Sequence, residues 1–298
     1  MPTPSQPQKQ HYSGTYFVQD RENEEELRRV AEQDRLVTAS MGGVLVEQAD
    51  PSAFRRVLDV ACGTGGWVIE AAQTYPEMSL VGVDVNRHVI EYARAQAAAH
   101  HVGDRVEFRV MDALSLLDFP DASFDLVNLR FAISFVRTWD WPRVLNELLR
   151  VLRPGGVVRL TDEEVIHQSN SPAAMQFCEM VLGALFRSWH LFAQESTGLT
   201  AHLVPLLSQH GCQRVQTKAH ALQYRAGTPE GQVYIEDGMR IFRTLRPFLQ
   251  KWGCMSKDYD AICHQAVEEM QRPDFCAVWH LLTSWGTKPR SKSQQPQP

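Results

Sequence analysis

The sequence predicts an α/β fold in which helices cover both faces of a mostly parallel sheet. Between residues 55 and 161, short runs rich in β-branched residues alternate with stretches of helical periodicity, which is the pattern of β–α–β units. The chain has 298 residues, 44% of them hydrophobic and 22% charged, so it can bury a substantial core. We therefore expect one elaborated domain and exclude collagen, coiled coil and wholesale disorder.

The first half of the chain supplies most of the expected elements. Apolar residues at helical spacing predict an amphipathic helix over 20–41, ahead of the sheet. Helices are also expected after the first, second and fourth strands, where apolar residues recur on one face. The run Arg-Pro-Gly-Gly at 153–156 predicts a turn before the fifth strand. The five expected strands are 56–61, 80–84, 106–110, 124–129 and 157–161.

After residue 162 the pattern changes to helical stretches rich in large apolar side chains. Helices are expected around 175–189 and near 201–210, and strands near 214–224 and 277–285. The organisation we predict comprises a flexible tail at 1–19, a helical lid at 20–52, one domain at 53–288 with a helical insertion at about 228–272, and a disordered tail at 289–298.

Charge, cysteine use and hydropathy exclude several classes of protein. Thirty Lys and Arg against 35 Asp and Glu give a net charge of −5, so we expect no nucleic-acid partner. Six cysteines without a C-x-x-C pair predict reduced thiols and no metal site. No apolar run is long enough to cross a bilayer, and the first ten residues lack a signal-peptide segment, so we expect no membrane partner and a cytoplasmic location.

A glycine-rich segment follows the first strand and is the most informative motif. The letters DVACGTGG at 59–66 stand between a strand and a helix, where glycines allow a tight turn and close approach of a ligand. Asp84 closes the second strand, where a carboxylate can accept hydrogen bonds from a ribose diol. Asp112 follows the third strand and could accept a hydrogen bond from the amino group of an adenine. Together these positions predict an adenosine-containing cofactor.

A dinucleotide site is the alternative interpretation of this loop. The pattern G-x-G-x-x-G counted from Gly63 would need its third glycine at Val68. A β-branched residue there hinders the close approach of helix and strand that a pyrophosphate site uses. An NAD-dependent oxidoreductase is therefore disfavoured.

Four segments of the first half of the chain stand in a characteristic order and spacing. They are VLDVACGTGGWVIEAA, GVDV, VMDALSLLDFPDASFDLV and LLRVLRPGGVVRLTD. In this order they resemble the class I S-adenosylmethionine-dependent methyltransferases, in the small-molecule branch of the ubiquinone and menaquinone biosynthesis enzymes. The resemblance covers about 54–162. It implies a Rossmann-like, seven-stranded sheet whose last strand is antiparallel, with S-adenosylmethionine as cofactor and S-adenosylhomocysteine as product.

The resemblance also assigns residues to the cofactor. It puts Asp59 where the family's acid orients the methionine moiety. It puts Ala61 where relatives usually carry glycine, so we expect less space near the methionine carboxylate. Tyr16, on the N-terminal segment that we expect to fold over the cofactor, is predicted to lie near the sulfonium, because an aromatic face attracts a cation. The other residues predicted to bind the cofactor are Cys62, Gly63, Gly65, Asp84, Val85, Met111, Asp112, Ala113 and Leu129.

The predicted activity is methyl transfer to a small, partly apolar or aromatic molecule. Transfer from a sulfonium is an in-line displacement that mainly needs alignment and exclusion of water, so the absence of a catalytic triad is uninformative. His167, His190, Glu163 and Arg130 are candidates for a base or a substrate contact, because they lie on the ligand side of the sheet. The acceptor atom and the oligomeric state, with a homodimer one option, stay open. A non-catalytic cofactor-binding regulatory partner is an alternative.

Overall fold

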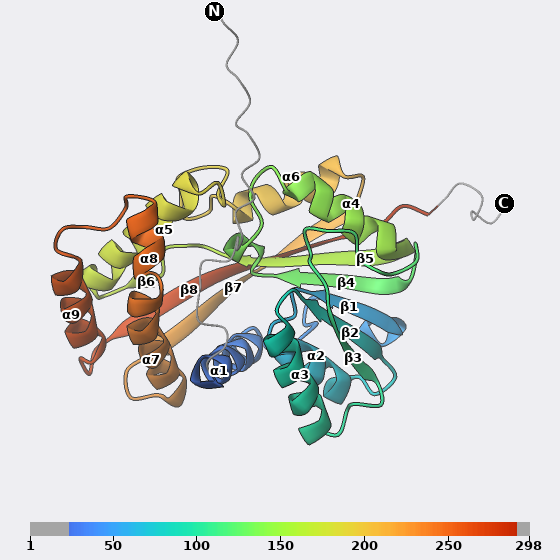
Figure 1. The fold of residues 1–298 in the computed structure, drawn as a ribbon, viewed down its shortest axis with the longest axis horizontal. Coiled ribbons are helices and arrows are strands. Elements are labelled where there is room, and N and C mark those ends of the chain that lie inside the picture. Colours follow the sequence, from blue (N-terminus) through green and yellow to red (C-terminus); the bar gives the residue numbers. More distant parts are fainter. Residues whose placement is uncertain (1–23, 291–298) are drawn as a thin grey trace, which may run out of the picture.

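The computed structural model describes residues 24–290 and has one sheet at its centre (Figure 1). The strand order is β3-β2-β1-β4-β5-β8-β6, and β7 pairs with β8. Strands β1 to β5 pair in parallel, whereas β8 is antiparallel to β5 and to β7. The strands are β1 (Arg56–Val60), β2 (Ser79–Asp84), β3 (Val106–Val110), β4 (Phe124–Arg130), β5 (Leu152–Glu163), β6 (Gln168–Ser169), β7 (Gln213–Arg225) and β8 (Cys276–Thr287).

Helices cover both faces of this sheet. In Figure 1, α2 and α3 lie below the strands, and α4 and α6 lie above them. Short 3-10 turns occupy Pro51–Ala53, Ala132–Ser134 and Thr200–His202. The helices are α1 (Glu24–Ser40), α2 (Gly66–Thr74), α3 (Arg87–Ala99), α4 (Trp141–Val151), α5 (Pro172–Arg187), α6 (Leu203–Gln209), α7 (Pro229–Thr244), α8 (Arg246–Lys251) and α9 (Tyr259–Met270).

Alternation along the strands builds a separate core on each face. Val57 of β1 packs with the apolar residues of α2 and α3, whereas Leu58 and Val60 pack on the opposite face with residues of α4, α5 and α6. Successive side chains of a strand point to opposite faces, so a strand buried on both sides reads as a continuous apolar run. The sequence VLDV of β1 is apolar except for Asp59, and all four residues are buried.

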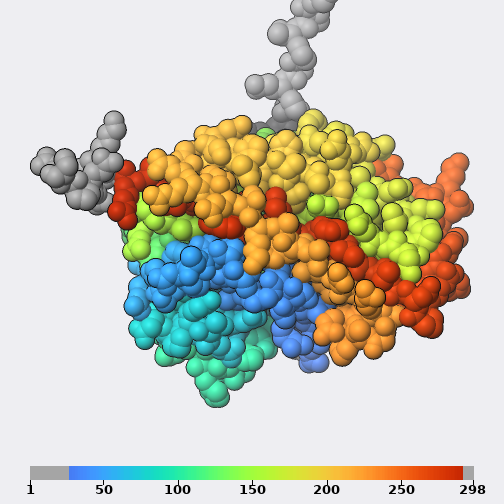
Figure 2. Space-filling view, turned by 180° about the vertical axis from the view of Figure 1, so that it is seen from behind, coloured from blue at the N-terminus to red at the C-terminus, as the bar shows by residue number. Residues whose placement is uncertain are grey.

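The second half of the chain forms a helical block beside the sheet. Helices α7, α8 and α9 lie between β7 and β8 in sequence and gather with α5 at the left of Figure 1. Helix α1 packs against both α2 and α7. Figure 2 shows the blue N-terminal part of the chain lying against the orange segment that contains α7. Helix α1 therefore connects α2, which covers one face of the sheet, with α7 of the helical block.

The predicted fold class is confirmed, with differences of detail. The sheet contains one more strand than predicted, the two-residue β6. Strand β5 begins at Leu152 instead of 157, because the turn at Gly155, with φ +82°, lies inside the strand and its N–H bonds to the carbonyl of Lys288. The predicted tails fall outside the described residues, apart from 289 and 290, and the predicted domain limits stay predictions.

No helix among the described residues is long and apolar enough to cross a membrane.

Candidate active site

The bend after β1 is set by backbone conformations that favour glycine. Gly63 has φ +53° and Gly65 has φ +80°, both in the left-handed region. A Cβ atom at Gly65 would lie 2.6 Å from Cζ of Phe108, so only glycine fits there. A Cβ at Gly63 would meet no atom within 4 Å, because this glycine faces the open side of the bend. The loop thus exposes bare backbone toward the cavity described below.

Asp84 stands beside this bend at the end of β2. Its Oδ2 accepts a hydrogen bond from the N–H of Gly63 at 3.2 Å, and its Oδ1 accepts one from the N–H of Asn86 at 2.9 Å. The side chain of Asn86 in turn caps α3. The carboxylate is therefore fixed between the glycine bend and the start of the next helix, on the wall of the cavity.

Asp59 lies at the end of a buried chain of hydrogen bonds. Its Oδ1 accepts from Nδ2 of Asn128 at 2.8 Å, and Oδ1 of Asn128 accepts from Nη1 of Arg159 at 2.7 Å. Nε of Arg159 donates to Oε1 of Glu47 at 2.8 Å. We call these four residues the relay. It links the segment after α1 to the cavity through two central strands.

The relay determines the protonation of its acids. Burial raises the pKa of Asp59 to about 7, although Arg130 and the hydrogen bond from Asn128 oppose this shift. Burial also opposes ionisation of Glu47, but the guanidinium of Arg159 outweighs it and lowers the pKa of Glu47. Glu47 and Arg159 therefore form a buried ion pair, while Asp59 changes its charge near neutral pH.

Helix α1 is attached directly to the glycine loop through Asp34. Oδ2 of Asp34 accepts from the N–H of Trp67 at 2.9 Å, and its Oδ1 pairs with the guanidinium of Arg130. A carboxylate at this place is favoured by the partial positive charge of the N-terminus of α2. A Cβ at Gly66 would lie 2.4 Å from Oδ2 of Asp34, so a glycine is needed for α1 to come this close.

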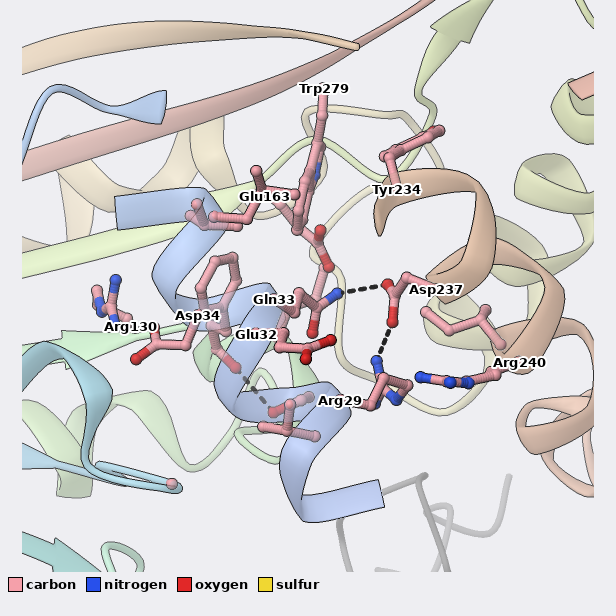
Figure 3. Close-up of a pocket in the computed structure, with 18 of the residues that line it drawn as sticks. Arg29, Glu32, Gln33, Asp34, Arg130, Glu163, Tyr234, Asp237, Arg240 and Trp279 are labelled. Carbon is pink, nitrogen blue, oxygen red and sulfur yellow. Dashed lines mark hydrogen bonds and ion pairs between the residues drawn. The ribbon is translucent and has the colours of Figure 1, made fainter. Parts of the chain in front are cut away.

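A cavity of about 300 Å³ begins at the glycine bend and continues between α1, α7 and β8 (Figure 3). Asp59, Gly63 and Asp84 line it at the sheet. Its inner part, which we call the chamber, is formed by apolar side chains that belong to the main core or pack against it. The chamber is lined by Ile133, Phe135, Val165, Phe177, Leu185 and Ile241.

Charged residues of α1 and α7 meet at another side of the cavity. Nε2 of Gln33 donates to Oδ2 of Asp237 at 2.8 Å, and Arg29 forms an ion pair with Oδ1 of the same carboxylate. Figure 3 shows Arg29 and Gln33 of α1 directed at Asp237 of α7. We call these three residues the clamp. The clamp fastens α1 to the helical block across the cavity.

Beside the apolar lining, Glu163, His167 and Tyr234 form a polar group. Nδ1 of His167 and the hydroxyl of Tyr234 are 2.8 Å apart, and Nε2 of His167 is 3.9 Å from Oε2 of Glu163. The ring of Trp279 lies against the imidazole, with centroids 4.8 Å apart and planes inclined by 32°. The strand ends of the sheet thus carry a carboxylate and an imidazole into the cavity.

The structure brings together part of the predicted site. The predicted residues that line the cavity are Asp59, Ala61, Cys62, Gly63, Asp84, Arg130, Glu163 and His167. Ala61 has φ +56°, so it adopts the backbone conformation that the glycine of relatives would favour. Burial raises the pKa of Cys62 well above its usual range, which keeps the thiol neutral.

Other predicted residues lie outside the lining of the cavity. Val85 is 58% exposed, and the exposed Asp112 accepts hydrogen bonds from the N–H of Leu114 and the hydroxyl of Ser115, which organises its own turn. The adenine assignment stays a prediction. Tyr16 lies outside the described residues. The remaining predicted residues that do not line the cavity are Gly65, Met111, Ala113 and Leu129.

His190 requires a correction, because the structure does not bring it to the cavity. The residue is 1% exposed, its Nδ1 is 2.7 Å from the hydroxyl of Ser188, and its ring packs edge-on against Phe248. It follows α5, which carries the chain away from the strand ends. Arg130 does line the cavity, but its guanidinium is held by Asp34 and Thr38 of α1.

Sequence reasoning missed the residues contributed by α1, α7 and β8. Gln33, Asp34, Tyr234, Asp237 and Trp279 come from elements whose place beside the sheet no local pattern indicates. The sequence offered one signal of these residues. The amphipathic helix predicted over 20–41 has polar residues on the face that should pack against the rest of the protein. Within residues 24–290, no three His, Cys, Asp or Glu residues are grouped so that they could hold a metal ion.

Comparisons with known proteins agree with this fold. Residues 57–156 match the family described as "Methyltransferase domain". A demethylmenaquinone methyltransferase of Symbiobacterium thermophilum is 40% identical over 101 residues, which cover 34% of this chain and 39% of the relative. The C-methyltransferase UbiE of Hahella chejuensis is 33% identical over 152 residues, which cover 51% of this chain and 59% of the relative. The chain thus spans less than two thirds of the length of these relatives.

Two solved structures extend the likeness to most of the chain. A phosphoethanolamine N-methyltransferase 2 of Haemonchus contortus has a TM-score of 0.55 at 21% identity, over 94% of this chain and 61% of that one. The [4+2]-cyclase SpnF has a TM-score of 0.51 at 18% identity, over 89% of this chain and 96% of that one. The sheet order and the glycine bend define a class I methyltransferase fold. The match to the family described as "Methyltransferase domain" is confined to residues 57–156.

Proposed function

We propose that the protein is an S-adenosylmethionine-dependent methyltransferase that acts on a small, partly apolar or aromatic molecule. The observation that carries this proposal is the continuous cavity, which has the glycine bend and Asp84 at one part of its wall and the apolar chamber at another. A nucleoside cofactor and an apolar acceptor can meet in such a cavity without water between them.

The residues at the glycine bend fit this cofactor. The carboxylate of Asp84 suits the ribose diol, because charge-assisted hydrogen bonds to hydroxyls are strong and directional. Asp59 suits the ammonium group of the methionine part, and the open space beside Gly63 allows close approach to the backbone. Val85, Met111 and the loop after β3 would hold the adenine. When bound, the cofactor supplies a methyl group activated by a sulfonium.

Helix α1 would act as a lid over the reacting groups. Asp34 attaches it to the N-terminus of α2, and the clamp attaches it to α7. These two contacts are polar and partly buried, so they can break and reform more readily than the apolar contacts by which Val37, at the other end of α1, packs against Trp279. A closed lid excludes water from the cavity, which in-line displacement favours.

Two measurements test this proposal. Calorimetric titration with S-adenosylmethionine, S-adenosylhomocysteine and NAD should give binding of the first two and none of NAD. A screen with cofactor labelled in the methyl group should then give transfer to one class among phenols, alcohols, amines and thiols. Because a structure of the same fold is named a cyclase, the transfer measurement is essential. Cofactor binding without transfer to any acceptor would favour a non-catalytic binding partner.

A further inference from the structure

A polar group lies beside the apolar chamber and consists of Glu163, His167 and Tyr234. Its place in the lining of the cavity indicates a chemical role. We propose that His167 is a general base that removes the proton of a hydroxyl group on an apolar acceptor, so that the protein is an O-methyltransferase of hydroxylated apolar molecules. Glu163 stabilises the imidazolium, and Tyr234 positions the ring. This inference rests on the proposed function and names the substrate class of the same site.

The geometry holds the imidazole in one orientation. Nδ1 lies within hydrogen-bond distance of the hydroxyl oxygen of Tyr234, and the indole of Trp279 lies against one face of the ring. Tyr234 is itself stacked on Tyr224, with ring centroids 4.5 Å apart and planes within 13°. The proposal requires the tautomer in which Nδ1 donates its proton to the oxygen of Tyr234, because Nε2 then carries the lone pair of the base.

Nε2 lies near Glu163 but beyond hydrogen-bond distance of its carboxylate. The separation of 3.9 Å exceeds hydrogen-bond distance, and no hydrogen bond to Nε2 is present within the described residues. A hydroxyl group can therefore bond to Nε2, and after proton transfer the imidazolium has a carboxylate nearby. This arrangement is a base with a third group beside it, which recurs in sites that use a general base.

The hydroxyl of Tyr234 and the thiol of Cys178, which face the imidazole, cannot serve as the base. Burial raises the pKa of Tyr234 well above its usual range and raises the pKa of Cys178 to about 11, so both stay protonated at neutral pH. Cys178 lines the same cavity from α5. Among the groups that face the ring from α5, α7, β5 and β8, a proton acceptor is available only at His167 and Glu163.

The need for a base identifies the acceptor group. An aryl amine such as 2-naphthylamine is neutral at pH 7 and already presents its lone pair, and a thiol ionises near pH 8.5 without help, whereas a phenol has a pKa near 10 and an alcohol a much higher one. A hydroxyl therefore gains most from a base at attack. The apolar chamber next to His167, with side chains such as Phe177 and Ile241, accommodates a ring or hydrocarbon body.

The step balances as a single displacement. The hydroxyl oxygen forms a bond to the methyl carbon as the bond from sulfur to that carbon breaks, and the sulfur keeps the electron pair. The hydroxyl proton passes to Nε2 of His167. The products are a methyl ether, a neutral thioether and an imidazolium, which later releases its proton to solvent.

Binding of a simple phenol tests the hydroxyl specificity without requiring turnover. The probe is 2-naphthol, compared with 2-methoxynaphthalene, on protein saturated with S-adenosylhomocysteine and followed by naphthol fluorescence. We expect naphthol to bind about fivefold more tightly than the ether, and His167→Gln to abolish this preference. His202→Gln is the matched control, because His202 lies outside the cavity against Phe192. Equal binding of the two probes, or no binding of naphthol, would overturn the assignment.

Turnover of labelled cofactor tests the base. We expect the label on the oxygen of 2-naphthol, a loss of about 10²–10⁴-fold in single-turnover rate for His167→Ala, and partial recovery when imidazole is added. Label on 2-naphthylamine or on a ring carbon, or a variant with the wild-type rate, would refute the inference.

Cofactor titration separates the two levels of the proposal. His167→Ala should bind S-adenosylmethionine within about twofold of wild type, because the residue does not lie at the glycine bend. If wild-type protein binds no S-adenosylmethionine, the proposed function fails and the inference with it. If it binds the cofactor and transfers methyl groups independently of His167, only the inference fails.

Discussion

At the scale of single residues, the cofactor site depends on two acids with different environments. Asp84 is held by two backbone N–H groups at the end of β2, whereas Asp59 is buried and bonded to an amide side chain. The first environment fixes a carboxylate for hydrogen bonding. The second makes ionisation costly and therefore sensitive to pH. Each acid predicts a different experimental response.

Asp84→Ala should weaken binding of S-adenosylhomocysteine by an order of magnitude or more. A charge-assisted hydrogen bond contributes roughly 1.5–3 kcal/mol, and 1.4 kcal/mol corresponds to a tenfold change. Asp104→Ala is the control, because the side chain of Asp104 is 75% exposed in the loop after α3. Calorimetric titration of both variants measures the difference. Equal affinities would mean that the ribose binds elsewhere.

Affinity for S-adenosylmethionine should rise with pH through about 7, because Asp59 must be ionised to face an ammonium group. Below that pH, affinity should fall up to tenfold per unit. Arg130, Arg159 and Asp34 also face Asp59, but Asp59→Asn alone should abolish the dependence between pH 5.5 and 7.5. A variant that keeps the wild-type profile would assign the titration to another group.

The same shift has a consequence for stability. The folded protein keeps a proton on Asp59 that the unfolded chain has lost above its ordinary pKa near 4. The contribution of Asp59 to the free energy of unfolding is therefore fully present below pH 4 and is lost as pH rises to about 7. Denaturant unfolding of wild type and Asp59→Asn at both pH values measures this contribution.

At the scale of elements, α1 and the segment after it are bound to the sheet by buried charges. Glu47→Gln should destabilise the protein by roughly 3–5 kcal/mol, because it leaves the fully buried guanidinium of Arg159 without its counter-charge. Glu77→Gln is the control, since its pair with Arg55 is exposed and should contribute less than about 1 kcal/mol. Urea unfolding of both variants measures the two values. A loss below 1 kcal/mol for Glu47→Gln would contradict the buried ion pair.

The clamp should control opening of the lid. Asp237→Asn keeps the size of the side chain but removes the charge that Arg29 binds, so α1 should separate from α7 more often. We expect faster proteolysis within α1 and weaker retention of bound cofactor, measured as a dissociation rate raised several-fold. Asp260→Asn is the control, because Asp260 pairs with the exposed Arg246. An unchanged dissociation rate would argue against a gating role for α1.

At the scale of the whole molecule, the sequence predicted the sheet and the glycine bend but only the part of the cavity that the sheet supplies. Strands such as VLDV are recognisable because a parallel sheet buries both faces, and Gly63 and Asp84 stand at fixed places in β–α–β units. The long-range contacts of α1 with α7, and of His167 with Tyr234 and Trp279, leave no local pattern. For the same reason His190 could not be distinguished from His167 before the path of α5 was known.

The central claim is that a nucleoside lies across the carboxyl ends of the strands with its sulfur toward the chamber. A crystal structure of the protein with S-adenosylhomocysteine tests this claim most directly. We expect both ribose hydroxyls within hydrogen-bond distance of Asp84 and the sulfur on the side of the cavity that contains His167. A ribose bound at another strand, or a thioether directed away from the chamber, would contradict it.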